Sequence, residues 1–133
     1  MRTIFLFLFL VTSLLCDGQT NEAANGYLKS GCGKDANKNY MGAIMDFNKA
    51  IEIEPTALAY FLRGLSKNHL EDYRGCIADM TKAIEIEPFG KAYLSRGVAK
   101  IIIGQKESGC LDLSKAGELG EEEAYNGIRR LCN

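Results

Sequence analysis

The sequence of 133 residues carries 16 lysines and arginines against 17 aspartates and glutamates, for a formal net charge of −1. This balance, and the lack of a stretch rich in basic residues, argues against nucleic acid or an anionic membrane surface as a partner. The length suits one small domain. The two prolines stand at matching repeat positions, which suits an all-helical array.

The first segment has the layout of a secretory signal peptide: Arg2, then an apolar run from Ile4 to Leu15, then small and polar residues. The run is shorter than the ~20 residues that a membrane-spanning helix requires. We predict a signal peptide over residues 1–18, cleaved before Gln19. The alternatives are a lipoprotein signal ending at a lipid-modified Cys16, and an uncleaved anchor. Each predicts export to the periplasm or the cell exterior, and a lipid at Cys16 would attach the chain to a membrane.

The rest of the chain repeats itself with a period of 33 residues. An aromatic residue, a glycine, a large apolar residue, an alanine and a proline recur at fixed offsets. The matching sets are Tyr27, Tyr60 and Tyr93; Gly31, Gly64 and Gly97; Phe47, Met80 and Leu113; Ala50, Ala83 and Ala116; and Pro55 and Pro88. A fixed period in the low thirties indicates a stack of supersecondary units.

Apolar residues spaced three and four apart predict two helices in each unit, and the prolines end the second helix of the first two units. In the third unit, Gly117 and Gly120 are expected to end the helix through a left-handed cap. A last helix is expected to begin at three consecutive glutamates. Helices are therefore expected over residues 21–37, 40–53, 57–69, 72–86, 90–103, 105–119 and 121–131.

This pattern resembles the tetratricopeptide repeat over roughly residues 24–132. The resemblance implies an all-α fold: an α-solenoid of three helix-turn-helix repeats and a C-terminal capping helix, following the signal peptide. The expected bounds are 22–56, 57–89, 90–120 and, for the cap, 121–133. It also implies that the three recurring tyrosines fill the core. The recurring glycines are expected to face small residues of the second helices, namely Ala43, Cys76 and Gly109.

Charged residues depart from the family pattern at three repeating positions. The family has Leu where Arg63 and Arg96 stand and Tyr where the repeating lysines stand, and an aspartate also recurs in each unit. These charged residues are Lys34, Lys67 and Lys100, with Asp46, Asp79 and Asp112. We expect each arginine to reach back to the aspartate of the preceding repeat, Arg63 to Asp46 and Arg96 to Asp79, and to fix the angle between repeats. The alternative is an arginine pair that grips a carboxylate ligand.

In the family, the first helices of the repeats line a concave groove that binds a peptide or a partner helix. Family members that clamp the carboxylate of chaperones carry Lys and Asn there, where this chain has residues such as Leu28, Cys32 and Leu65. An apolar segment or an amphipathic helix is therefore the expected ligand. The alternative is a stripe covered by the capping helix or by a second copy of the chain. The predicted partner-binding residues are Leu28, Leu58, Phe61, Leu65, Asn68, Leu94, Val98 and Ile101.

Apart from Cys16, the chain has four cysteines, which allow three disulfide connectivities in an exported protein. Cys110 and Cys132 are the candidate pair, because the cap that carries Cys132 should pack over the helix that carries Cys110. Cys76 occupies a small-residue position and is expected to be a buried thiol. Cys32 is the candidate for a free or reactive thiol.

His69 lies at a helix end with no metal-ligand spacing around it, and no catalytic triad or phosphate-binding loop is visible. We therefore expect no enzyme activity, no cofactor, no metal and no small-molecule substrate. The predicted function is an exported adaptor or scaffold that binds a protein or peptide partner. Two alternatives remain: a structural subunit of an envelope assembly that self-associates, and a thiol or redox-active protein that uses Cys32 or the Cys110–Cys132 pair.

Overall fold

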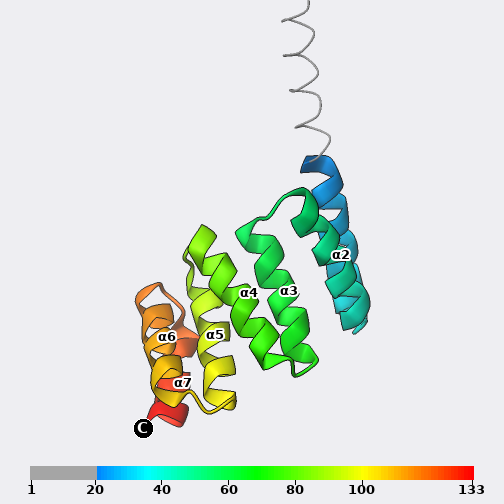
Figure 1. Cartoon of the computed structure of the whole chain (residues 1–133). Helices are drawn as coiled ribbons and strands as arrows, with labels where there is room; N and C mark the ends of the chain where they lie inside the picture. The colour runs from blue at the N-terminus through cyan, green and yellow to red at the C-terminus, as the bar shows by residue number, and fades with distance from the viewer. Residues whose placement is uncertain (1–20) are drawn as a thin grey trace, which may run out of the picture.

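The computed structural model describes residues 21–133, and every regular element in this range is a helix. Figure 1 shows these helices as a row in chain order, from the N-terminal helix at one end to the C-terminus at the other. The described part is thus an all-α solenoid, as the repeat pattern predicts. The predicted signal peptide and its cleavage or lipid site lie outside the described residues. Within residues 21–133, no helix is both long enough and apolar enough to cross a membrane.

Three helical hairpins follow one another, with bounds within one residue of those expected. The first pair is residues 21–36 and α2 (Tyr40–Ile53); the second is α3 (Ala57–His69) and α4 (Tyr73–Ile86); the third is α5 (Gly90–Ile102) and α6 (Lys106–Glu118). The cap differs from the single helix that was expected. It is a short α7 (Glu122–Gly127) that continues as a π-helical segment (Ile128–Cys132).

The turn of every hairpin has the same backbone conformation, which recurs with the period of the sequence. The second residue after the first helix has positive φ in each hairpin: Lys38 (62°), Glu71 (61°) and Gly104 (91°). The amide of the next residue then donates to a carbonyl five positions back, as from Asp72 to Lys67 at 2.9 Å. This is the hydrogen bond of a Schellman cap, which satisfies a carbonyl at the helix end.

The shared turn predicts that removing a glycine and introducing one at equivalent positions change the stability in opposite directions. Gly104→Ala is expected to lower the free energy of unfolding by about 1 kcal/mol, because a side chain in the left-handed region is strained. Glu71→Gly is expected to raise it by about 0.5 kcal/mol, since the strain relieved slightly exceeds the entropy cost of glycine. Urea unfolding followed by circular dichroism measures both changes. A loss of stability in Glu71→Gly would contradict a strained turn.

Side-chain caps and prolines set the other helix boundaries. Asn39, Thr56 and Asp72 accept hydrogen bonds from amides in the first turns of α2, α3 and α4, at 2.9–3.1 Å. Such caps satisfy amides that have no partner within the helix. At the other end, Glu54 and Glu87 are extended, as residues before proline prefer to be.

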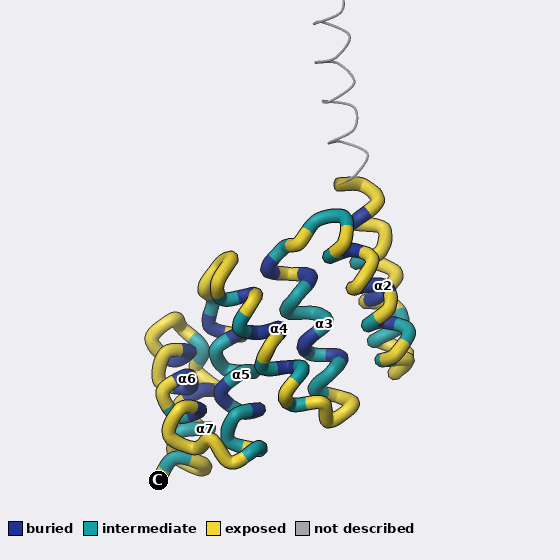
Figure 2. Tube along the Cα trace, viewed as in Figure 1, coloured by how far each residue is buried: buried dark blue, intermediate teal, exposed yellow. Residues whose placement is uncertain are grey.

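The core lies between the two helices of each hairpin, and Figure 2 shows the buried residues on the helix faces that meet. Phe47, Met80 and Leu113 are fully buried, with alanines beside them. The recurring glycine permits this approach: a Cβ on Gly97 would lie 2.8 Å from the carbonyl oxygen of Gly109, as the predicted pairing of these two residues requires. A larger residue at Gly97 would force α5 and α6 apart.

Two expectations about the ends of the solenoid are wrong. Tyr27 does not fill the core as Tyr60 and Tyr93 partly do, because it lies on the first described helix and no earlier described helix covers it; it is 38% exposed. Gly117 does not end α6. It is buried inside the helix, where a Cβ would lie 3.0 Å from the ring of Tyr125, so it makes room for the cap. Gly120, with a φ of 96°, alone supplies the left-handed residue.

Candidate functional site

Each second helix buries one aspartate against the first helix of its own hairpin. Asp46, Asp79 and Asp112 are 9%, 2% and 6% exposed. A lysine on the facing helix lies close to each carboxylate. The distances are 2.8 Å for Lys34–Asp46, 2.9 Å for Lys67–Asp79 and 2.9 Å for Lys100–Asp112. The same ion pair is therefore built three times along the solenoid.

The arginines do not pair as expected. Arg63 donates from Nε and Nη2 to the two carboxylate oxygens of Asp79, at 2.9 and 2.6 Å. Arg96 binds Asp112 in the same way, with both distances 2.8 Å. Each arginine thus binds the aspartate of its own repeat, not that of the preceding one. The reason is the glycine that follows Arg63: a Cβ on Gly64 would lie only 3.1 Å from the Cβ of Asp79, so the two helices bring arginine and aspartate together.

The link to the preceding repeat uses a neutral acceptor. Nη1 of Arg63 donates to Oδ1 of Asn48 at 2.9 Å, and Nη1 of Arg96 donates to Oγ1 of Thr81 at 3.2 Å. Each guanidinium also lies over the tyrosine of its repeat, 5.4 Å from the ring centroid. Protein groups therefore occupy the nitrogens of both guanidinium groups. This leaves no support for the alternative that the two arginines grip a carboxylate ligand.

The pKa values of two of these carboxyl groups, Asp46 and Asp112, are lowered by their partners. Hydrogen bonds from Lys34 and Ser30 lower the pKa of Asp46. Burial opposes ionisation of Asp112, but hydrogen bonds from Arg96 and Lys100 outweigh it and lower the pKa of this group. A depressed carboxyl pKa contributes stability above the pKa of the unfolded chain, and that stability is lost as the pH falls through the folded value. The stabilising effect of the Asp46 and Asp112 ion pairs is therefore present at neutral pH.

Three of the predicted partner-binding residues are engaged within the solenoid. The ring of Phe61 packs edge-on against Phe89, with centroids 5.1 Å apart. Phe61 and Leu65 both pack on the buried cluster that joins the second and third repeats. Ile101 lies against α6, since a Cβ on Gly109 would be 2.5 Å from its Cγ1. These contacts make all three residues part of the packing.

The remaining predicted residues are more open. Leu58, at the start of α3, is 54% exposed, and Leu28 and Asn68 are half-buried. Leu94 and Val98 line a hollow of about 410 Å³ between α5 and the C-terminal cap. Sequence reasoning missed the other wall of this hollow, which comes from the cap: Glu123, Asn126, Gly127, Arg130 and Leu131. The cap thus extends the surface formed by α5.

A disulfide holds the cap in this place. Cys110 on α6 and Cys132 at the end of the π-helical segment are bonded, with an S–S distance of 2.06 Å and Cα atoms 5.9 Å apart. This is the pair that the sequence singled out. Ala124 on the inner side of α7 is fully buried. The bond and this packing fix Arg130 and Leu131 beside the hollow.

The two free cysteines among residues 21–133, Cys32 and Cys76, are poor nucleophiles. Burial raises the pKa of the Cys76 thiol to about 11, and neighbouring aspartates add to the effect. Cys32 is exposed, yet partial burial and the charge of Asp35 raise its pKa as well. Because the thiolate is the reactive form, neither residue supports the thiol-enzyme alternative.

His69 has a structural contact that the sequence did not indicate. Its ring, at the end of α3, stacks on the ring of Tyr40 at the start of α2, with centroids 4.6 Å apart. The contact joins the first and second repeats. Within residues 21–133, no group of three or more His, Cys, Asp or Glu side chains is arranged to hold a metal ion.

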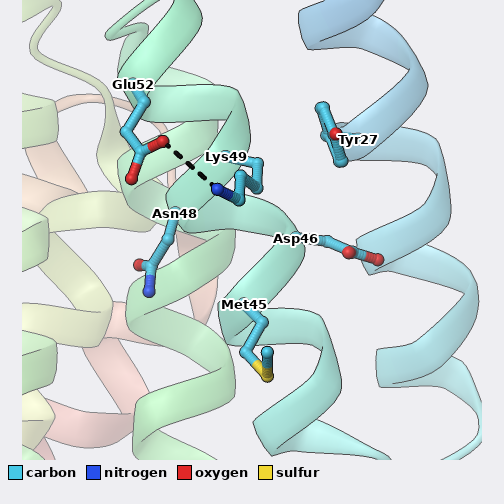
Figure 3. A pocket seen from close by; sticks show the side chains of 6 residues that line it. All are labelled: Tyr27, Met45, Asp46, Asn48, Lys49 and Glu52. Atoms are coloured by element: carbon cyan, nitrogen blue, oxygen red, sulfur yellow. Dashed lines mark ion pairs between the residues drawn. The ribbon is translucent and has the colours of Figure 1, made fainter.

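A second hollow lies at the N-terminal end of the solenoid. It has a volume of about 300 Å³ and is lined by Tyr27 of the first helix and by residues of α2. Figure 3 shows Asp46 of α2 pointing toward the helix that carries Tyr27, with Met45 and the Lys49–Glu52 ion pair further along α2 and Asn48 on the side of α2 away from Tyr27. A further hollow of about 300 Å³ is also lined by Tyr27, together with Ala23, Gly26 and Ser30 of the same helix.

Comparison with known proteins gives structural matches only. No family model matches the sequence, and a search of curated proteins finds no match. The first TPR domain of Spaghetti (RPAP3), bound to the HSP90 peptide SRMEEVD, has a TM-score of 0.81 at 22% identity over 84% of this chain and 92% of that one. The Arabidopsis OM64 TPR domain has a TM-score of 0.82 at 25% identity, covering 84% and 96%. The second TPR domain of human RPAP3, in complex with an HSP70 peptide, has a TM-score of 0.78 at 20% identity, covering 87% and 98%.

These neighbours and the three repeated hairpins define the class of fold. The described residues have the fold of a tetratricopeptide-repeat domain.

Proposed function

We propose that this protein is a non-catalytic, exported adaptor that binds an extended or helical segment of a protein partner. The observation that carries the proposal is the hollow between α5 and the cap, where Leu94 and Val98 are lined up against Leu131. Export rests on the signal-peptide pattern of residues 1–18. The structural neighbours are consistent with peptide binding, since two of them hold chaperone peptides.

The chemistry of the hollow favours a partner segment with an apolar anchor. Leu94, Val98 and Leu131 contribute apolar side chains to the lining, while Glu123 and Arg130 contribute one negative and one positive charge. An apolar side chain buried among these leucines would contribute affinity, and the two charges would set the register. Leu58 offers a further exposed apolar contact on the preceding repeat. The positions equivalent to the chaperone-binding Lys and Asn are apolar in this chain, so an acidic chaperone tail is not the proposed ligand.

The test compares substitutions inside and outside the hollow. Val98→Asp places a charge among the apolar side chains of the lining and is expected to weaken binding of a purified partner by at least tenfold. Leu111→Asp is the matched control, because Leu111 is 73% exposed on α6 and does not line the hollow. A photo-crosslinking residue at Val98 identifies the partner in an envelope extract, and titration calorimetry measures the affinity.

Equal affinity of the wild type and a folded Val98→Asp variant would contradict the groove assignment. A dimeric mass in solution that Val98→Asp abolishes, with no other protein crosslinked, would instead favour the self-associating subunit. Analytical ultracentrifugation distinguishes the two cases.

A further inference from the structure

We propose that the N-terminal end of the solenoid carries a binding site for a guanidinium group, formed by Tyr27 and Asp46 and separate from the groove. The ligand is an arginine side chain presented by a protein surface. The inference comes from comparing the first repeat with the other two, which contain the same site already filled by an arginine of the chain.

The second and third repeats show what the filled site looks like. The guanidinium of Arg63 binds both carboxylate oxygens of Asp79 and lies over the ring of Tyr60. The lysine one turn further along the helix, Lys67, binds Oδ2 of the same carboxylate. Arg96 repeats this arrangement over Tyr93. Aspartate, tyrosine and lysine are thus the fixed parts, and the arginine completes them.

The first repeat keeps the fixed parts and lacks the arginine. Ser30 stands at its position, and Ser30 Oγ donates to Oδ2 of Asp46 at 2.6 Å. Lys34 binds the same oxygen at 2.8 Å. Both donors therefore converge on Oδ2, as Nε of the arginine and the lysine do in the other repeats. Oδ1, the oxygen that receives Nη2 elsewhere, accepts no hydrogen bond from the described residues.

Space and charge at the first repeat also fit an added cation. Tyr27 lines two hollows of about 300 Å³, and one of them is also lined by Asp46. Tyr27 is 38% exposed, whereas Tyr60 and Tyr93 are half-buried. In each later repeat, the cluster of one aspartate, one lysine and one arginine has a net charge of +1, whereas Asp46 and Lys34 of the first repeat have a net charge of zero. One bound guanidinium would give the first cluster the same net charge of +1.

Arginine suits this site better than lysine does. A planar guanidinium can donate to a carboxylate oxygen while its face lies on an aromatic ring, and an ammonium group offers no such plane. Among the described residues, Ser30 and Lys34 are the partners of Asp46 and no arginine binds it, so the arginine is proposed to come from another molecule.

The first experiment uses the chain's own tyrosines as controls. N-acetyl-arginine methylamide is titrated into protein with ¹³C-labelled tyrosine rings. A saturable shift of the Tyr27 ring signals is expected, with no matching shift of Tyr60 or Tyr93, whose faces are occupied. The lysine analogue is expected to bind at least threefold more weakly. Equal shifts at the three tyrosines, or equal binding of the two probes, would overturn the proposal.

The second experiment fills the site from within. Ser30→Arg is expected to raise Tm by about 4 °C and to abolish the probe-induced shift of Tyr27. Ser30→Lys is the matched control and is expected to raise Tm less. The gain from Ser30→Arg should disappear in an Asp46→Asn background. A Ser30→Arg protein that is folded, no more stable than the wild type and still responsive to the probe would overturn the proposal.

A dilution series without probe distinguishes the sources of the arginine. A Tyr27 signal that changes with protein concentration, and no longer does so in Arg130→Gln, assigns the arginine to a second copy. A signal independent of concentration excludes a second copy as the source of the arginine. The probe titration and the Ser30→Arg variant test the site itself.

Discussion

Replacing Asp79 with asparagine is expected to lower the free energy of unfolding by about 3 kcal/mol. Asp79 is the partner of two cations, Arg63 and Lys67, whose side chains are only 18% and 21% exposed. Without the carboxylate, both charges stay largely buried, and removing one partner of a buried pair costs about 3–5 kcal/mol. The lower end applies because both cations keep some contact with water. Urea unfolding followed by circular dichroism measures the loss.

Asp46→Asn is the matched control in the first repeat. Asp46 pairs with one cation, Lys34, whose side chain is 41% exposed and can turn to solvent. The expected loss is about 1 kcal/mol, the scale of a partly exposed ion pair. Equal losses from the two variants would mean that the arginine–aspartate pairs do not stabilise the second and third repeats. Double variants with Arg63→Met would then measure the coupling directly.

Replacing Cys110 and Cys132 with serine is expected to lower the free energy of unfolding by about 3 kcal/mol, because the bond closes a loop over a sequence separation of 22 residues. The loss should appear first in the cap. The helix α7 is only six residues long and continues into a π-helical segment. The disulfide and the buried side chain of Ala124 therefore hold it against the solenoid. Hydrogen exchange of α7 amides should become faster than that of α3 and α4 amides.

The control compares the effect of a reductant on the wild type and on the double-serine variant. Unfolding of the wild type should shift to lower urea on reduction, whereas the double-serine variant should not respond, since Cys32 and Cys76 are already free thiols. An unchanged midpoint for the reduced wild type would contradict a stabilising role. The same variant tests the groove: a detached cap removes Arg130 and Leu131 from the hollow and should weaken partner binding.

Local sequence signals were sufficient for the helices. Proline spacing, helix caps and three-and-four apolar periodicity place α2 and α3 at the bounds that the structure shows. These signals act over a few residues, so they can be read without knowing how the chain folds back. The repeat period adds the order of the hairpins, because stacked neighbours bury the faces that one hairpin leaves open.

The partners of the charged and apolar site residues could not be predicted in the same way, because they depend on contacts between different helices. The sequence by itself determined which charged residues recur, Arg63 and Asp79 among them, but two aspartates were within reach of each arginine. The tertiary structure decided between them, because the close approach of α3 and α4 at Gly64 brings Asp79 nearer than Asp46. Likewise, the apolar stripe could be listed from helical periodicity, yet only packing showed that Phe61 meets Phe89 and that Val98 faces the cap. Periodicity defines a helix face; what covers that face depends on residues far away in the chain.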